Sequence, residues 1–249
     1  MAVRKLFVIG IGTGDPDQIT VQAIKAVNQA EVFFVMGKGA EKRELVQVRS
    51  AILREHMTRP YTVVEIPDPP RDRRPADYVG AVEEWHDRRA QVLENEFVAI
   101  GETTAALLVW GDPSLYDSTL RVVERVLDRA WISFDYEVVP GITAPQTLAA
   151  RHKIVLNQVG EPVHITTGRR LRHGLPRGVR DAVVMLDADD SFRELPADTE
   201  IWWAAYLGMP DETLLHGTVG AVGAQISAAR AELRERKGWI FDTYAVRLR

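Results

Sequence analysis

The sequence predicts an α/β fold built on mainly parallel strands. The 249-residue chain is 46% hydrophobic and 27% charged, a balance typical of a globular protein with a large buried core. Short apolar segments alternate with longer segments of helical period, the order that places parallel strands beneath helices. Three of the apolar segments end in glycine-containing loops that lead into helices, as the strands of such sheets do. Together these observations favour an α/β protein.

The first half of the chain follows this strand, loop and helix order. Residues 5–9 form an apolar run, and a glycine-rich loop leads to a helix over 19–29, in which Val21, Ile24 and Val27 share one face. β-Branched residues favour a strand at 61–66, and four prolines exclude residues 67–75 from the interior of any helix or strand. The predicted strands are 5–9, 32–36, 61–66 and 105–110, and the predicted helices are 19–29, 41–57 and 76–96.

The second half of the chain is richer in strands. Helical patterns cover residues 119–130, 145–152 and 219–237. Apolar segments predict strands at 133–139, 163–167, 182–186, 200–206 and 239–246. The best place for a domain boundary is the loop around residues 114–119, where one α/β unit ends and another begins. We therefore predict a first α/β domain over residues 1–116 and a second over residues 117–249.

Composition excludes several classes of function. The chain has no cysteine, which rules out disulfides, thiolate metal sites and cysteine nucleophiles. The six histidines lack the spacing of metal ligands, and no metal is expected. A net charge of −4 offers no basic field for nucleic acid, and no apolar run approaches the roughly 20 residues of a membrane helix. Because residues 1–4 show no signal-peptide pattern, the cytoplasm is the expected location.

The first glycine-rich loop resembles part of a dinucleotide-binding fingerprint. It reads G-I-G-T-G-D-P over residues 10–16 and connects a strand to a helix, where backbone N–H groups can hold a phosphate. However, Asp15 occupies the position of the third glycine, and its carboxylate would repel a pyrophosphate. Glu31 opens the next strand, whereas a ribose-binding acid should close it. A nicotinamide dinucleotide is therefore disfavoured.

The tripeptide Gly-Asp-Pro occurs twice, at residues 14–16 and 111–113, each time just after an apolar strand. Turn chemistry explains either copy alone, since Asp and Pro both favour turns. Two copies at strand ends indicate a ligand, because open α/β sheets bind ligands beyond the carboxyl ends of their strands. A third loop, V-P-G-I-T-A at residues 139–144, allows close backbone approach at Gly141. Thr143 can cap the following helix or contact a ligand.

These loops resemble the three motifs of the tetrapyrrole (corrin/porphyrin) methylases. The matching stretches are G-I-G-T-G-D-P-D-Q-I-T at residues 10–20, W-G-D-P-S-L-Y at 110–116 and V-V-P-G-I-T-A at 138–144. The resemblance covers essentially the whole chain. It implies the architecture of a class III methyltransferase, with two α/β domains and a cofactor cleft between them. It also implies S-adenosyl-L-methionine as cofactor, a small-molecule tetrapyrrole as substrate and a homodimer.

The same resemblance assigns cofactor contacts in this sequence. Thr13 matches the contact in the first loop, although relatives often have proline there. The second loop supplies three contacts and the third loop another three, and two later contacts fall near Leu186 and Leu207. The expected cofactor-binding residues are Thr13, Gly111, Asp112, Leu115, Gly141, Thr143, Ala144, Leu186 and Leu207.

Two further stretches resemble one subgroup of the family, I-W-W-A-A-Y-L-G-M-P at residues 201–210 and G-W-I-F-D-T-Y at 238–244. Members of this subgroup methylate ring carbon C1 of a precorrin and release an acetyl group as acetate. The hydrolytic step needs a general base and a donor for the developing oxyanion. The catalytic candidates are Asp15, Tyr116, Asp117, Ser118 and Arg121, for which helix capping at Ser118, a turn at Asp117 and a surface position for Arg121 are the structural alternatives.

Precorrins have several carboxylates, so arginine-rich segments are candidates for the substrate-binding surface. One is Arg71, Arg73 and Arg74 in the proline-rich segment. The other comprises Arg169, Arg170, Arg172, His173, Arg177 and Arg180. A solvated charged surface is the alternative for both.

The sequence is also compatible with four other functions. The chain could methylate another position of the macrocycle, or a macromolecule such as the modified histidine of elongation factor 2 or ribosomal RNA. The net charge of −4 counts against RNA. A module that binds a nucleotide or tetrapyrrole without chemistry and a nicotinamide oxidoreductase are the remaining alternatives.

Overall fold

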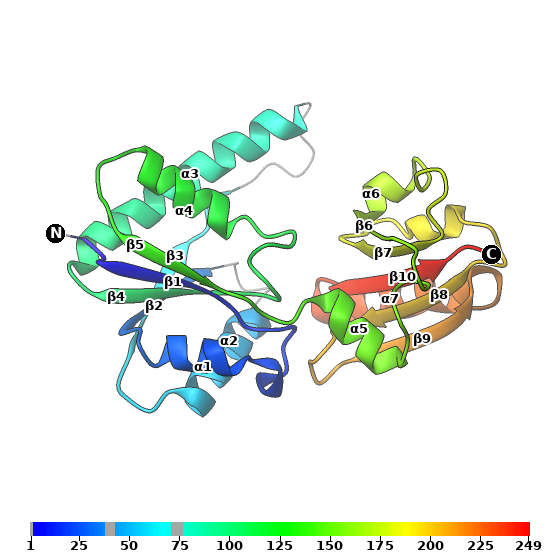
Figure 1. Ribbon diagram of the computed structural model, residues 1–249, viewed down its shortest axis with the longest axis horizontal. Coiled ribbons are helices and arrows are strands. Elements are labelled where there is room, and N and C mark those ends of the chain that lie inside the picture. The colour runs from blue at the N-terminus through cyan, green and yellow to red at the C-terminus, as the bar shows by residue number, and fades with distance from the viewer. Residues whose placement is uncertain (1, 38–42, 71–76) are drawn as a thin grey trace. The chain divides into compact units, whose positions relative to one another are not determined.

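The computed structural model of the chain describes residues 2–37, 43–70 and 77–249 (Figure 1). It divides into two compact units, each with its own sheet. The first unit comprises the chain up to Gly12 together with Pro16–Ile142. The second comprises Thr13–Asp15 and Thr143–Arg249. The α/β class predicted from the sequence is confirmed.

The first unit is built on a five-stranded parallel sheet in the order β3-β2-β4-β1-β5. Within this unit, Figure 1 shows α1 and α2 on one face of the sheet and α3 and α4 on the other. The strands are β1 (Lys5–Gly10), β2 (Val32–Gly37), β3 (Thr62–Pro67), β4 (Thr104–Val109) and β5 (Asp135–Val139). The helices are η1 (Pro16–Gln18), α1 (Val21–Val27), α2 (Arg43–His56), α3 (Tyr78–Ile100) and α4 (Thr119–Asp128).

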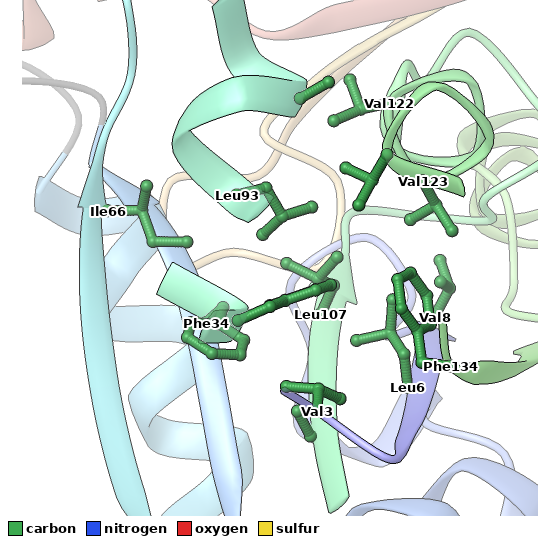
Figure 2. Packing of buried hydrophobic residues seen from close by; sticks show 14 of the residues in the cluster. Val3, Leu6, Val8, Phe34, Ile66, Leu93, Leu107, Val122, Val123 and Phe134 are labelled. Carbon is green, nitrogen blue, oxygen red and sulfur yellow. The ribbon is translucent and has the colours of Figure 1, made fainter. Parts of the chain in front are cut away.

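Both faces of this sheet are buried, which explains the continuous apolar runs of its central strands. Every residue of β4 is buried. Figure 2 shows the packing between the sheet and helices α3 and α4, where Leu93, Val122 and Val123 meet Leu107 and Val8. On the opposite face, helices α1 and α2 pack against a second cluster of buried apolar residues. These two layers fix the carboxyl ends of the strands from which the glycine-containing loops emerge.

His86, on α3, is a buried histidine whose replacement should stabilise the protein. Its side chain is 3% exposed, and neither ring nitrogen hydrogen-bonds any group in the described part of the chain. Burial, assisted by the charge of Arg125, lowers the pKa of His86 below its ordinary value of 6.5. An unsatisfied buried polar group costs about 1–3 kcal/mol, so His86→Leu is expected to raise the free energy of unfolding by about 1–2 kcal/mol.

The gain in unfolding free energy from His86→Leu should depend on pH. Because the pKa of His86 is lower in the folded than in the unfolded protein, the wild type loses stability as the pH falls through the unfolded value. Denaturant unfolding at about pH 8 and about pH 5.5 should therefore show a larger gain from His86→Leu at the lower pH. His173→Leu, at an exposed histidine, is the matched control and should change stability by less than about 0.5 kcal/mol. Equal or lower stability of His86→Leu would contradict the prediction.

The second unit contains a mixed sheet in the order β6-β7-β10-β8-β9. Its strands are β6 (Val163–Thr167), β7 (Asp181–Met185), β8 (Glu200–Ala205), β9 (Thr213–Thr218) and β10 (Asp242–Arg247). Its helices are α5 (Ala144–His152), α6 (Gly168–Leu171), η3 (Ser191–Glu194) and α7 (Val219–Lys237). Only the β6–β7 pair is parallel, and the other three pairs are antiparallel. The expectation of mainly parallel strands is therefore correct for the first sheet and wrong for the second.

One strand was not predicted. β9 lies at the edge of the second sheet, and its residues alternate only weakly between half-buried and exposed. The segment also contains Gly217, which weakens a strand pattern. An edge strand with one antiparallel neighbour needs less apolar surface than a central strand, so the sequence signal is weak.

The division into units also differs from the predicted boundary between residues 116 and 117. The structure changes from one unit to the other between Ile142 and Thr143. Helix α4 packs against α3, and β5 pairs in parallel with β1, with Lys5 opposite Asp135. The residues after the second Gly-Asp-Pro loop thus complete the first sheet before the chain enters the second unit.

In the ranges that the structure describes, no helix combines the length and apolar character needed to cross a membrane. Across the same ranges, no three histidine, aspartate or glutamate side chains gather as a set of metal ligands.

Candidate active site

Three loops follow adjacent parallel strands of the first unit, β4, β1 and β5. The loops after β1 and β4 are joined by backbone hydrogen bonds. The N–H of Gly111 donates to the carbonyl of Gly12 at 2.7 Å, and the N–H of Ile11 donates to the carbonyl of Val109 at 2.9 Å. The first two motifs therefore continue the sheet beyond its regular strands, at the edge where open α/β sheets bind ligands.

Glycines allow these loops to pack backbone against backbone. A Cβ atom at Gly141 would lie 2.1 Å from the carbonyl oxygen of Gly111, and one at Gly10 would lie 2.6 Å from the nitrogen of Gly141. Gly111 itself has a φ of 67°, which favours glycine. Three glycines from three separate motifs thus form one contact. Gly111 and Gly141 were among the predicted cofactor-binding residues, whereas Gly10 is a motif residue for which no cofactor contact was predicted.

Asp112 ties the second loop to the third. One carboxylate oxygen accepts hydrogen bonds from the N–H and hydroxyl of Ser114, and the other accepts from the N–H of Gly141 at 2.8 Å. Burial favours a higher pKa, but the hydrogen bonds from Ser114 and Gly141 outweigh it, so the pKa of Asp112 lies below its ordinary value. The side chain is therefore an anion that organises two of the predicted cofactor loops.

The second loop ends in an exposed tyrosine in an unusual backbone conformation. Leu115 is half-buried, and its N–H donates to the carbonyl of Asp112. Tyr116 has a φ of 52° and is 44% exposed. Left-handed conformations are rare for aromatic residues and gather at functional sites. Desolvation raises the pKa of the Tyr116 phenol, so the phenol is a hydrogen-bond donor at neutral pH.

The three remaining candidates of this loop lie at the start of α4. Asp117 accepts a hydrogen bond from the N–H of Thr119 at 2.6 Å and thereby caps the helix, while Ser118 makes no side-chain capping bond. Arg121 is exposed and donates to the backbone carbonyl of Asp117 at 3.2 Å. The capping role considered for Ser118 thus belongs to Asp117.

Arg49 of α2 also reaches this edge of the first sheet, which the sequence did not indicate. Its Nε donates to the carbonyl of Leu108, near the end of β4, at 3.1 Å. Burial lowers the pKa of Arg49 to about 10, and the charge of Asp117 opposes this shift. A half-buried cation therefore lies close enough to Asp117 to interact with it. In the sequence Arg49 is one of several arginines on an amphipathic helix. Its contact with the end of β4 becomes visible only in the folded structure.

Thr13 and Asp15 of the first motif belong to the second unit. Thr13 is 2% exposed, and its hydroxyl donates to that of Thr147 at 3.3 Å. Asp15 pairs with Arg151 at 3.6 Å, and Arg151 also pairs with Glu212 at 2.8 Å. Asp15 is thus part of an ion-pair chain whose two other members were not predicted. Their signal is absent from the sequence because they lie far from Asp15 along the chain.

The third motif begins helix α5. Gln146 Oε1 accepts hydrogen bonds from both the N–H and the hydroxyl of Thr143, each at 2.8 Å, and Ala144 is the first residue of the helix. The capping role considered for Thr143 is therefore present. Ala144 is half-buried at this helix N-terminus, where Pro145 has no N–H and the N–H of Thr147 donates to the carbonyl of Thr143, so few backbone N–H groups remain for a ligand.

The two later cofactor candidates differ in exposure. Leu186 follows β7 and is 56% exposed, with a φ of 53°. Leu207 is 6% exposed and packs in the core of the second unit with Leu148 and Trp202. Of the two side chains only that of Leu186 is exposed, so a cofactor contact at Leu207 would have to involve its backbone.

The two stretches that resemble one subgroup of the family contact each other. They pair along the antiparallel strands β8 and β10. Trp203 donates from its indole nitrogen to Asp242 at 2.8 Å, and the hydroxyl of Tyr206 donates to the carbonyl of Trp239 at 2.6 Å. The subgroup resemblance therefore rests on one continuous part of the second unit.

The arginine-rich segments are only partly described. Arg71, Arg73 and Arg74 lie outside the described residues. In the second segment, Arg172 pairs with Asp189 and Arg180 donates to the carbonyl of Leu248. All six side chains of the second segment are exposed: Arg169, Arg170, Arg172, His173, Arg177 and Arg180.

The three loop motifs lie at the carboxyl edge of the parallel sheet, and the comparisons with known proteins place this α/β chain among the methyltransferases. The chain belongs to the tetrapyrrole (corrin/porphyrin) methylases, whose family model matches residues 5–223. It is 46% identical to "Precorrin-6A synthase [deacetylating]" of Sinorhizobium sp., over 98% of this chain and 95% of that protein. The resemblance inferred from the motifs is confirmed.

Solved structures agree with this assignment. The structure of the cobalamin synthesis related protein CobF from Corynebacterium diphtheriae is 38% identical and superposes with a TM-score of 0.83, covering 99% of both chains. The uroporphyrin-III C-methyltransferase of Thermus thermophilus, complexed with S-adenyl homocysteine, has a TM-score of 0.58 at 17% identity, covering 97% of this chain and 91% of that one. At that identity the second comparison concerns the fold alone.

Proposed function

We propose that this chain is an S-adenosylmethionine-dependent methyltransferase that converts precorrin-5 to precorrin-6A with release of acetate, in aerobic cobalamin biosynthesis. The observation on which this proposal depends is the 46% identity to a deacetylating precorrin-6A synthase over nearly the whole of both chains. The two stretches that resemble the subgroup fall within this aligned length and contact each other through Trp203 and Asp242.

The loops of the first unit suit a cofactor with cationic groups. S-adenosylmethionine has a sulfonium and an ammonium group, and the carboxylate of Asp112 remains charged because its pKa is lowered. The close backbone packing at Gly111 and Gly141 leaves carbonyl and N–H groups, rather than side chains, at the end of the strands. We propose that Thr13, Leu115, Thr143, Ala144, Leu186 and the backbone at Leu207 complete the cofactor contacts.

Methyl transfer from this cofactor does not require the protein to form a covalent intermediate. When bound, S-adenosylmethionine supplies an electrophilic methyl group. The loops then need to align the accepting ring carbon with that methyl group and to exclude water. In this proposal Asp112 serves alignment by holding the second loop to the third through Gly141.

Deacetylation requires proton movements that this chain must provide. Water adds to the acetyl carbonyl carbon, the bond between that carbon and the ring breaks, and its electron pair passes to the macrocycle as acetate leaves. We propose that Tyr116, which is a neutral phenol in a strained exposed position, donates to the developing oxyanion. Asp117 is the proposed acceptor of the water proton, with Arg121 beside it. Asp15 and Ser118 are weaker candidates, since Asp15 pairs with Arg151.

The proposal includes a homodimer located in the cytoplasm and acting on a small molecule, as the family resemblance implies. The net charge of −4 is consistent with a substrate other than nucleic acid. Light scattering on the purified chain would test the dimer directly.

The first test is binding of S-adenosylhomocysteine, measured by calorimetry. Wild-type protein is expected to bind this product analogue, and Asp112→Ala should bind it about tenfold more weakly, a loss of about 1.4 kcal/mol. The reason is that the substitution frees Gly141 and Ser114 from the carboxylate that joins their loops. Asp135→Ala, at the other end of β5, is the matched control and should bind like wild type.

The outcomes separate the competing functions. Binding of NADH in place of S-adenosylhomocysteine would favour an oxidoreductase, and binding of neither would overturn the proposal. For the subgroup, acetate release from precorrin-5 is the decisive measurement. Methylation without acetate would indicate another position on the macrocycle, and Tyr116→Phe should slow acetate release by about 10²-fold if its hydroxyl stabilises the oxyanion.

A further inference from the structure

Leu186 combines two unfavourable features at the end of β7. Its left-handed backbone, with a φ of 53°, is rarely adopted by a branched apolar residue. Its side chain is also 56% exposed, so it gains little from burial. Such a conformation persists only where the surroundings enforce it, and it gathers at sites that contact ligands. The structure must therefore contain groups that hold this position.

The next residue, Asp187, is held on both carboxylate oxygens. Oδ1 accepts from the N–H of Asp189 at 3.1 Å and from the hydroxyl of Ser191 at 2.9 Å. Oδ2 accepts from the N–H of Ser191 at 2.8 Å and from the hydroxyl of Tyr244 at 2.7 Å. Asp187 is 5% exposed, and these four hydrogen bonds use the full accepting capacity expected of a carboxylate.

The backbone of Asp187 is also fixed. Arg230, which is 3% exposed, donates to its carbonyl and pairs with Asp190 and Asp242. On the other side, a Cβ atom at Gly168 would lie 2.3 Å from Asp187 Oδ1. Asp187 is thus enclosed between α6 and α7 and has no room to move.

We propose that Asp187, with Ser191, Arg230 and Tyr244, forms a platform that fixes Leu186 as an apolar contact of the bound cofactor. This Asp187 platform consists of positioning residues, because none of its side chains needs to touch the ligand. The inference rests on the proposed function, since the ligand is taken to be S-adenosylmethionine. It adds that the affinity for the cofactor depends on buried polar groups behind the contacting leucine.

A purely structural role for Asp187 is the competing explanation, and a second buried aspartate provides the control for it. Asp181 begins the same strand β7, is 1% exposed and accepts from Arg247 at 2.5 Å and from the N–H of Gln158 at 3.2 Å. Asp187→Asn and Asp181→Asn therefore make the same chemical change at opposite ends of one strand.

Asparagine cannot replace Asp187 in either amide orientation. A backbone N–H donates to each carboxylate oxygen, from Asp189 to Oδ1 and from Ser191 to Oδ2. The amide NH₂ group would therefore always face a donor. Tyr244→Phe is a milder second variant, which removes one hydrogen bond of the platform and takes the place of Asp187→Asn if that variant does not fold.

The experiment is a double-mutant cycle on the full chain, with S-adenosylhomocysteine affinity as the readout. Leu186→Ala and Asp187→Asn are each expected to weaken binding about tenfold, and the double variant should bind about as weakly as either single variant. Asp181→Asn should bind within about twofold of wild type even if it is less stable. Hydrogen exchange of the ligand-free protein over residues 186–191 should be faster in Asp187→Asn and unchanged in Asp181→Asn.

The results distinguish this inference from the proposed function. If wild type binds and the losses in the double variant multiply to about a hundredfold, Asp187 does not act through Leu186 and the inference is wrong. Unchanged hydrogen exchange in Asp187→Asn would also overturn it, whatever the ligand. Failure of wild type to bind S-adenosylhomocysteine would overturn the proposed cofactor together with the cofactor role of the Asp187 platform.

Discussion

Gly141→Ala is expected to lower the free energy of unfolding by roughly 3 kcal/mol and to abolish detectable binding of S-adenosylhomocysteine. The new Cβ would lie 2.1 Å from the carbonyl oxygen of Gly111 and 2.7 Å from the carbonyl carbon of Gly10, all of them backbone atoms. Backbone of two strand ends cannot move aside as a flexible side chain can. The N–H of Gly141 would also shift away from Asp112. Denaturant unfolding and calorimetry measure the two effects.

Gly223→Ala is the control, because it makes the same chemical change but is expected to leave stability unchanged or to raise it. Gly223 lies in helix α7, and the nearest atom to a Cβ there is a ring carbon of Phe192 at 3.6 Å, an ordinary contact. Alanine is favoured over glycine in helices by about 1 kcal/mol, so this variant should be as stable as wild type or more stable. A Gly141→Ala protein with wild-type stability and affinity would show that the three loops do not pack as described.

Arg230→Met is expected to destabilise the protein by about 3–5 kcal/mol, because breaking a buried ion pair from one side leaves unpaired charge. Arg230 pairs with Asp190 and Asp242, and the Asp242 side chain is only 4% exposed. Methionine fills a similar volume but supplies no donor to either carboxylate. Arg236→Met is the matched control on the same helix. Arg236 is 54% exposed where it pairs with Asp211, so its loss should cost less than about 1 kcal/mol.

The loss of unfolding free energy in Arg230→Met, called the deficit below, should also depend on pH. Burial raises the pKa of Asp242 to about 6, although the charge of Arg230 opposes that rise. Because the folded pKa exceeds the ordinary value of 3.8, the contribution of Asp242 to stability is present below that value and is lost as the pH rises through about 6. Without Arg230 the pKa should rise further, so the deficit should be smaller at about pH 5 than at about pH 8. A deficit that grows in acid would contradict this explanation.

The sequence predicted the elements of the first unit well because its central strands are buried on both faces. The apolar run of β4, in which every residue is buried, is too short for a buried helix and therefore predicts a strand. The order of strands in the second sheet was not predictable, since β10 inserts between β7 and β8 from the far end of the chain. The boundary was placed too early for a similar reason. Nothing local in β5 indicates that it pairs with β1.

For the candidate site, motif residues were predictable and their partners were not. Gly111, Asp112 and Gly141 were identified from their loops, but the structure adds that Asp112 bonds Gly141. Arg49 and Asp187 left no signal, because their significance depends on tertiary neighbours such as Leu108 and Tyr244. The family resemblance predicted cofactor contacts at Leu186 and Leu207 alike. The structure distinguishes them, because the side chain of Leu186 is exposed and that of Leu207 is buried.

The assignment of Thr13–Asp15 to the second unit limits how this protein can be divided. A gene cut once, between Ile142 and Thr143, would leave this tripeptide on the wrong fragment. The separated C-terminal fragment would then lack the aspartate that pairs with Arg151 and the threonine that bonds Thr147. Swapping the second unit between relatives therefore requires two exchanged segments, the first loop and the C-terminal half. A chimera made with a single crossover would combine Thr13 and Asp15 of one relative with the residues at positions 147 and 151 of another.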